Sequence, residues 1–154
     1  MENNDIPAAK HHTAIAVERP FRHSIAVQLR FNDFDMLGHL NNSMYFSYFD
    51  IGKAEYFNTI RHGKHHWGRV DVVIANVNCD FIAPIYFTER IVVKTQIAYF
   101  HDKSFCVLQA LVDENMGSTK AVCRTVMVGF DPTAGKSAPL SQEWKDAISA
   151  FEGI

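Results

Sequence analysis

The sequence lacks several features that mark whole classes of protein. Its charges nearly balance, with 15 Lys and Arg residues against 17 Asp and Glu, so it has no basic excess for generic nucleic-acid binding. No apolar run approaches the roughly 20 residues of a membrane-spanning helix. Residues 1–5 have neither the basic start nor the apolar core of a signal peptide. We therefore expect a cytoplasmic protein with no nucleic-acid partner and no membrane span.

Cysteine is also scarce. The three cysteines, Cys79, Cys106 and Cys123, are an odd number, and each lies in a run of residues typical of a strand. Buried free thiols in a reducing cytoplasm are the natural interpretation. Cys79 is not predicted to be a nucleophile, because the neighbouring carboxylate of Asp80 would raise the pKa of its thiol.

Length and composition indicate one domain with its own core. The chain has 154 residues, of which 47% are hydrophobic and 21% are charged, as in ordinary globular proteins. Residues 1–20 are polar and poorly periodic, and we expect a flexible arm there, with a short strand near residues 13–17. The domain proper is predicted over residues 21–131. A linker and a C-terminal helix packed on the domain follow over residues 132–154.

The most informative stretch is a polar loop between a strand and an apolar helix. A strand is predicted over residues 21–31, because residues 25–31 alternate apolar and polar side chains roughly as a half-buried strand does. Residues 42–60 are so rich in aromatic and aliphatic side chains that a helix there is apolar nearly all round and should be enclosed. Gly63 predicts the end of this helix.

The loop carries the groups that acyl transfer needs. Asn41 or Asn42 is a suitable helix N-cap, and the first N–H groups of a helix have no internal partners, so they can hold a developing oxyanion. Gly38 permits a sharp bend, which lets the carboxylate of Asp35 reach the helix end. A carboxylate there can act as nucleophile or general base. Alternatively, Asp33 and Asp35 only cap turns.

Four more strands are predicted after the helix, over about residues 70–81, 85–101, 104–114 and 118–130. The short connections between the last three are typical of antiparallel hairpins. Crossover helices are missing, which argues against a parallel doubly wound sheet. We therefore predict an α+β fold, with a five- or six-stranded antiparallel sheet wrapped around one long helix.

A short second helix is predicted near the C-terminus. Trp144, Ile148 and Phe151 recur at helical spacing, with Ser141 as N-cap and Gly153 as the stop signal. This apolar stripe should pack on the domain or on a partner subunit.

The loop over residues 61–69 contains His62, His65, His66 and Trp67. Histidines are common zinc ligands, but no matching cysteine or carboxylate cluster lies nearby in the sequence. We predict a solvated loop and no metal site, with Trp67 as an apolar wall beside the substrate.

The loop and the helix together resemble a known family. The pattern Arg30-Phe31-x-Asp33-x-Asp35-x-x-Gly38-His39-x-Asn41-Asn42-x-x-Tyr45-x-x-Tyr48-Phe49 resembles the signature of the 4-hydroxybenzoyl-CoA thioesterase-like family, which are hotdog-fold acyl-CoA thioesterases. The form His39-Leu40-Asn41-Asn42 is similar to the branch that hydrolyses long-chain acyl-CoA. The resemblance runs from about residue 24 to residue 131 and includes Asp80-Phe81-x-x-Pro84 and Lys103-Ser104-Phe105.

The resemblance implies catalytic roles. Asp35 matches the catalytic carboxylate, acting by direct attack or by activating water. The backbone N–H of Asn42 matches the donor that polarises the thioester carbonyl. Asp33 is the rival carboxylate, and its place in the pattern makes it structural.

The resemblance also implies substrate contacts. Ser104 matches a serine that lies near the active site of the neighbouring subunit, although a simple turn residue is an equal alternative. Lys103 and Arg124 are candidate contacts to CoA phosphates. The residues predicted to bind substrate are Gly38, His39, Tyr45, Trp67, Ser104 and Lys103.

The implied reaction is hydrolysis of an acyl-CoA to the free acid and CoA, with no metal or redox cofactor. The family pairs its sheets edge to edge, which implies a homodimer or a homotetramer with active sites at the interface. Two alternatives stay open. One is an enoyl-thioester hydratase of the same fold, disfavoured because Asp35 and His39 are four residues apart rather than five and no proline is present. The other is a protein that binds acyl-CoA or acyl carrier protein without turnover.

Overall fold

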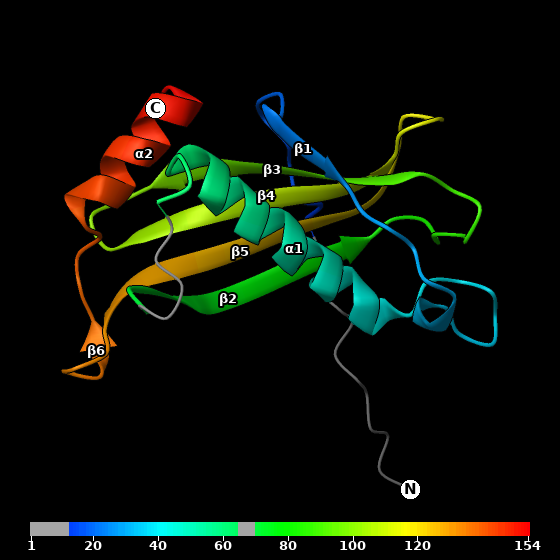
Figure 1. Ribbon diagram of the computed structural model, residues 1–154, viewed down its shortest axis with the longest axis horizontal. Coiled ribbons are helices and arrows are strands. Elements are labelled where there is room, and N and C mark those ends of the chain that lie inside the picture. Colours follow the sequence, from blue (N-terminus) through cyan, green and yellow to red (C-terminus); the bar gives the residue numbers. More distant parts are fainter. Residues whose placement is uncertain (1–12, 65–69) are drawn as a thin grey trace, which may run out of the picture.

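The computed structural model describes residues 13–64 and 70–154, which form one curved sheet, two α-helices and a short 3-10 helix, η1 (Phe31–Asp33) (Figure 1). The six strands are antiparallel in the order β1-β3-β4-β5-β2, with β6 paired to β5. The strands are β1 (His23–Ala26), β2 (Val72–Phe81), β3 (Ile91–Phe100), β4 (Ser104–Asp113), β5 (Ser118–Asp131) and β6 (Lys136–Ser137). Helix α1 (Asn42–Ile60) lies along one face of the sheet, and α2 (Gln142–Glu152) covers one end. The predicted α+β hotdog architecture is confirmed.

Helix α1 has the bounds that the sequence predicts. Of the two candidate N-caps, Asn41 takes the role, and its side chain accepts the Ser43 N–H at 3.0 Å. Gly52 lets the helix lie directly on β3, because a Cβ at this position would overlap the side chain of Val93. The predicted enclosure is incomplete, since Phe46 and Ile51 remain 40% and 49% exposed. In this chain alone, one side of the apolar helix is uncovered.

The core divides into two clusters along α1. The first lies under the N-terminal half of the helix, around Tyr45, Tyr48 and Phe49. The second lies under the C-terminal half, around Tyr56 and Phe57, and takes in Trp144 and Ile148 of α2. The helix therefore has separate packing partners at its two ends.

Helix α2 closes the second cluster. Ser141 is its N-cap and Gly153, with φ at 74°, ends it in the left-handed region, as predicted. The Trp144 ring packs edge-on against Phe57, with centroids 5.0 Å apart, and its Nε1–H donates to Asp71 Oδ2 at 3.1 Å. The helix thus packs on its own domain.

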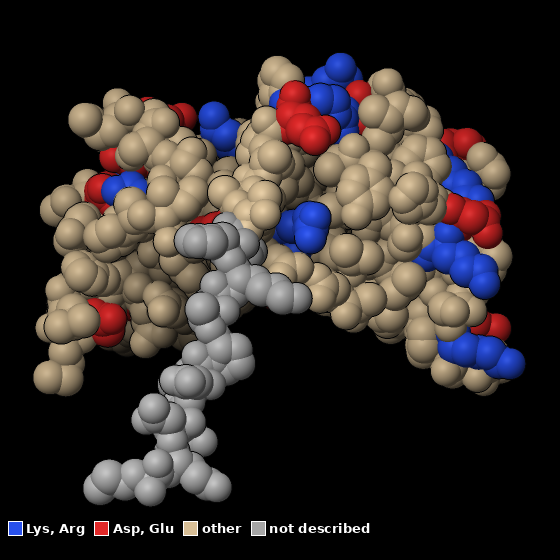
Figure 2. Space-filling view, turned by 180° about the vertical axis from the view of Figure 1, so that it is seen from behind, with Lys and Arg blue, Asp and Glu red and all other residues tan. Residues whose placement is uncertain are grey.

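The face of the sheet opposite α1 is crossed by residues 13–20. Ile15 N–H donates to Asp80 Oδ2 on β2 at 2.8 Å, and Arg19 Nη2 donates to Ile97 O on β3 at 2.6 Å. The short strand predicted near residues 13–17 is absent, because this segment runs across the strands and cannot join their ladder. Most charged side chains on this face lie towards its margins (Figure 2).

Other differences from the predicted strands have local causes. Strand β1 is shorter than predicted, because its last ladder partner, Val92, lies next to the start of β3. Strand β3 starts at Ile91 and not at residue 85, because residues 82–90 form a loop. Lys120 Nζ holds this loop through Glu89 Oε1, at 2.5 Å, and the Pro84 carbonyl, at 3.2 Å. The two-residue strand β6 lies in the predicted linker.

Within the described residues, neither helix has the length and apolar character to cross a membrane.

Candidate active site

The loop between β1 and α1 is a small hairpin. Asp35 N–H donates to His39 O at 2.9 Å, Gly38 N–H donates to Asp35 O at 3.1 Å, and Asn41 N–H donates to Asp33 O at 2.9 Å. Gly38 has φ at 76°, a left-handed conformation that favours glycine, so the predicted sharp bend is confirmed. The hairpin carries Asp35 back towards the start of α1.

The start of α1 leaves one backbone donor free. The N–H groups of Leu40, Asn41 and Ser43 are bonded to Ile85 O, Asp33 O and the Asn41 side chain. The N–H of Asn42, the first helical residue, has no acceptor anywhere in residues 13–64 and 70–154. The helix dipole makes this end locally positive, so a ligand oxygen is the natural acceptor.

Asp35 and Asn42 line the same hollow, which has a volume of about 340 Å³. His39 and Tyr45 line it too, so four of the predicted site residues meet here. Gly38 and Asp35 border a second hollow of about 250 Å³, walled by Phe31, Phe34 and Phe87. The remaining walls of the first hollow are Leu37, Leu40, Phe81, Ile82, Ala83 and Pro84.

The Asp35 carboxylate is exposed and only partly engaged. Its Oδ1 accepts the N–H of Leu37 at 2.9 Å and the N–H of His39 at 3.3 Å, so Asp35 does cap its own turn. Its Oδ2 has no partner among the described residues. Turn capping and chemistry are therefore compatible, because one oxygen fixes the side chain and the other stays available.

Asp33 is held in a different way. It is buried, and its Oδ2 accepts the Tyr48 hydroxyl at 2.6 Å and the Arg30 Nε–H at 3.3 Å. Burial by itself raises the pKa of Asp33, but the hydrogen bonds from Tyr48 and Arg30 outweigh it and hold the pKa below its ordinary value. These contacts support a structural role for Asp33.

Aromatic contacts shape the hollow. The His39 ring packs edge-on against Tyr86, with centroids 5.2 Å apart, and neither ring nitrogen has a partner in the described part of the chain. Tyr45 packs edge-on against Phe81 at 5.0 Å, and burial raises the pKa of Tyr45, which argues against a role as an acid. Phe81 and Ile82 were not predicted as site residues, although the Asp80-Phe81-x-x-Pro84 pattern marks this strand end.

The other predicted residues do not reach this hollow within one chain. Ser104 begins β4, pairs with Val128, and precedes Phe105, which packs under the C-terminal half of α1. Lys103 lies beside Ser104 in the β3–β4 connection. Arg124 lines a hollow on the opposite face of the sheet. Trp67, like His65 and His66 in the same loop, lies outside the described residues.

Cys79 lies opposite Cys123 on the paired strands β2 and β5. Its hydrogen bond with Cys123, its burial and the nearby charge of Asp80 all raise the pKa of the Cys79 thiol. This supports the prediction that Cys79 is not a nucleophile. Among residues 13–64 and 70–154, no three His, Cys, Asp or Glu side chains are grouped as metal ligands.

Comparison with known proteins identifies the family. Residues 29–148 match the model of the thioesterase-like superfamily. The chain belongs to the thioesterase-like superfamily. The chain is similar in sequence to the uncharacterized protein YsmA of Bacillus subtilis. The two are 28% identical over 124 residues, which are 79% of this chain and 82% of YsmA.

Solved thioesterases share the fold. A Thermus thermophilus thioesterase, solved with coenzyme A and Zn, is 26% identical, with a TM-score of 0.74 over 87% of this chain and 96% of its own. A 1,4-dihydroxy-2-naphthoyl-CoA thioesterase from Synechocystis is 20% identical, with a TM-score of 0.73 over 84% of this chain and 96% of its own, and shows the fold alone. This thioesterase-like chain thus has the hotdog fold of solved thioesterases.

Proposed function

We propose that this protein is an acyl-CoA thioesterase, which converts an acyl-CoA and water to a carboxylic acid and CoA. One observation carries the proposal: the unpaired Asn42 N–H and the half-free carboxylate of Asp35 border one hollow. Membership of the thioesterase-like superfamily and the likeness to a thioesterase solved with coenzyme A support it.

In the proposed reaction, the thioester carbonyl oxygen accepts the Asn42 N–H at the positive end of α1. Negative charge grows on this oxygen in the transition state, and one such donor is worth roughly 3 kcal/mol of barrier. Asp35 Oδ2 then has two routes. It attacks the carbonyl carbon, expels the CoA thiolate and forms an anhydride that water cleaves, or it takes a proton from the water that attacks. Neither route uses a metal or a redox cofactor.

The proposed active form is a dimer. The backbone of β2 has no strand partner on its outer edge within the described sheet. Ile74 and Val77 on β2 are 49% and 40% exposed, and β2 runs along the edge of the sheet below α1 (Figure 1). Antiparallel pairing of two β2 strands would cover this surface and the open edge. The two-fold rotation would also bring the Ser104 end of one protomer towards the Asp35 end of the other.

The test is thiol release from short, long and aromatic acyl-CoAs by wild type and Asp35→Asn. We expect turnover in wild type and a loss of at least about 100-fold in Asp35→Asn, with acyl-CoA binding retained. Glu55→Gln is the matched control, because Glu55 is an exposed carboxylate on α1 that faces His23 of β1, at the edge of the sheet opposite β2. Full activity in Asp35→Asn would remove Asp35 from the mechanism.

The same panel separates thioesterase from acyl-CoA sensor. Binding of acyl-CoA without release of thiol from any substrate would contradict the enzyme and favour the sensor. The preferred acyl chain, left open by the sequence, would follow from the relative rates. The free thiols of Cys79, Cys106 and Cys123 fit the cytoplasm, where we place the reaction.

A further inference from the structure

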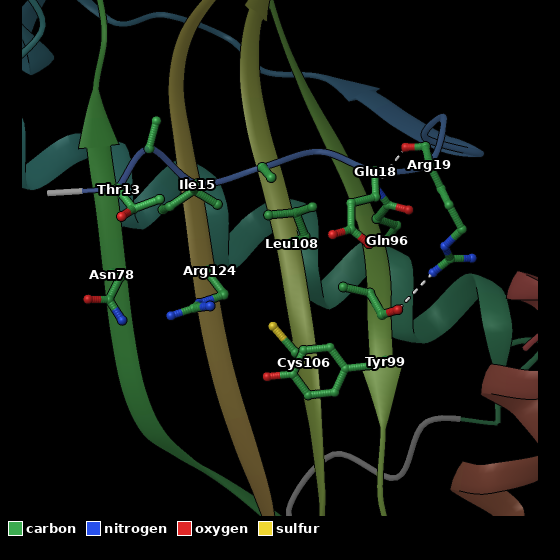
Figure 3. A pocket seen from close by; sticks show the side chains of 13 residues that line it. Thr13, Ile15, Glu18, Arg19, Asn78, Gln96, Tyr99, Cys106, Leu108 and Arg124 are labelled. Atoms are coloured by element: carbon green, nitrogen blue, oxygen red, sulfur yellow. Dashed lines mark hydrogen bonds between the residues drawn. The ribbon is translucent and has the colours of Figure 1, made fainter.

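A larger hollow lies on the outer face of the sheet, away from Asp35. Its volume is about 450 Å³, and it is bounded on one side by residues 13–19 of the crossing segment (Figure 3). We call it the outer trough. Its floor comes from β2, β3, β4 and β5. It shares no lining residue with the hollow around Asn42.

Four side chains form one row across the floor of the outer trough. The register pairs Gln96 with Leu108, Leu108 with Arg124, and Arg124 with Asn78. An amide, an apolar side chain, a cation and a second amide therefore follow one another across the strands. Two strand spacings, or roughly 10 Å, separate the backbones of Gln96 and Arg124.

Arg124 brings an uncompensated positive charge to the trough. Its guanidinium makes no ion pair or hydrogen bond with any described residue. Figure 3 shows it pointing towards Asn78, with the Tyr99 hydroxyl on the same side of the trough. A guanidinium flanked by hydrogen-bonding groups suits a carboxylate or a phosphate.

The carboxylates near the trough lie away from Arg124 or are already bonded. Asp80, one row along the sheet, accepts the Ile15 N–H. Glu18 lies at the Gln96 end (Figure 3). Arg19, the other cation of the lining, donates to backbone carbonyls of β3 and forms an ion pair with Glu152. Arg124 is thus the cation in the described lining that is left for a ligand.

Gln96 marks the other end of the trough. It is only 1% exposed, and its Nε2 donates to Arg19 O at 3.0 Å. Its Oε1 is buried and has no donor among the described residues. A buried amide oxygen without a partner destabilises the fold, so a ligand donor at this position would be favoured.

We propose that the outer trough binds an organic anion. Its carboxylate or phosphate lies on Arg124, its apolar body lies beside Ala98 and the exposed Tyr99 ring, and a hydroxyl or amide donor at its far end bonds Gln96 Oε1. A hydroxy acid released by a thioesterase reaction and the phosphopantetheine portion of CoA both have this chemistry. The binding itself does not depend on the catalytic role of Asp35.

Calorimetric titration of the full chain tests the proposal with three probes: 8-hydroxyoctanoate, octanoate and pantetheine 4′-phosphate. Octanoate has the anion and lacks the distal donor, so we expect it to bind about fivefold more weakly than 8-hydroxyoctanoate. Preference for pantetheine 4′-phosphate over both acids would identify the CoA portion as the source of the anion. Preference for 8-hydroxyoctanoate would identify a free acid.

Variants locate the site. Arg124→Gln should weaken binding at least tenfold, because it removes a charge-assisted hydrogen bond and keeps a polar side chain. Arg90→Gln, an exposed arginine paired with Glu114, is the matched control and should bind as wild type does. Asp35→Asn should also leave binding unchanged.

Three results would overturn the proposal: no saturable binding of any probe, equal binding by wild type and Arg124→Gln, or a change of probe binding in Asp35→Asn. The last would place the probe in the Asp35 hollow. Because every readout is binding, a failure here is distinct from a failure of the proposed thioesterase.

Discussion

The two ends of α1 have opposite surroundings. At the C-terminal end, α2 seals the core with Trp144, and the Tyr56 hydroxyl donates to the buried carboxylate of Glu152 at 2.5 Å. At the N-terminal end, the Asn42 N–H is unpaired and the hairpin tip is exposed, with Leu37 76% accessible. One end of the helix is therefore closed by packing, and the other, where we propose that substrate binds, is open.

The difference shows where a small protein can leave polar groups unsatisfied. Glu152 is bonded to Tyr56, to Ile97 N–H and to Arg19, so the closed end links α1, β3, α2 and the crossing segment. These links hold the helix in place without help from its first turn. The N-terminal end can then keep a free donor, whose cost would be recovered by the proposed hydrogen bond to substrate.

The largest expected effect comes from a substitution at the closed, C-terminal end of α1. Trp144→Ala removes a fully buried ring that packs on Phe57 and Phe105, and should lower the free energy of unfolding by about 3–5 kcal/mol. Urea unfolding measures the loss. The kcat of the remaining folded protein should stay near that of wild type, because the ring is far along α1 from Asn42. A loss below about 1 kcal/mol would show that α2 does not seal the core.

Asp33→Asn tests the support beneath the open end. The pKa of Asp33 is lowered in the folded state, so its ionised form stabilises the fold above the ordinary pKa of about 4, and this stability is lost as the pH falls through the folded value. At neutral pH the free energy of unfolding of wild type should exceed that of the variant by about 1–3 kcal/mol. This gap in stability should close below about pH 4. Urea unfolding at several pH values measures it, and a gap that does not change with pH would contradict this account.

The two N-caps sharpen the comparison. Asn41 caps α1 and Ser141 caps α2, each through its side chain. Replacement of either by Ala should cost about 1 kcal/mol of stability. Only Asn41→Ala should also lower kcat, by several-fold, because it loosens the turn that aims the Asn42 N–H. Thermal melts and thiol-release assays of both variants measure these effects. Equal losses of kcat in the two variants would contradict a specific role for the N-terminal end of α1.

The smallest expected effect on stability is at the hairpin tip. Leu37→Ser should change the free energy of unfolding by less than about 0.5 kcal/mol, because Leu37 is exposed. It should raise KM for long-chain acyl-CoA, since Leu37 lines the hollow, and leave KM for acetyl-CoA nearly unchanged. Met116→Ser, at an exposed tip far along the sequence, is the control. An unchanged KM for every chain length would exclude Leu37 from substrate contact.

The sequence predicted the features that depend on local chemistry. The bounds of α1, its cap by an asparagine and the bend at Gly38 follow from capping and turn preferences. The start of β3 was misplaced because Ile85, Tyr86 and Phe87 look like a strand. These residues form a loop that is held by a local turn between Tyr86 and Glu89 and by the distant Lys120, which bonds Glu89 and Pro84.

Features that depend on distant partners could not be predicted. Nothing local indicates that residues 13–20 cross the sheet, because their anchors, Asp80 and Ile97, lie far away in the sequence. For the same reason Phe81 and Ile82 were missed as walls of the hollow. The resemblance supplied Asp35 and Asn42, and the structure adds what they share: one free oxygen and one free donor at a common hollow.

The strand order also bears on how the chain folds. Strands β3, β4 and β5 are consecutive hairpins with short connections, whereas β1 and β2, which flank α1 in the sequence, occupy the two edges of the sheet. Pairings between sequence-distant strands carry the larger loop-closure cost and are expected to form late. The segment with Asp35 connects the β1 edge to the helix. We therefore expect the central hairpins to form early and the loop with Asp35 to reach its final geometry among the last parts of the molecule.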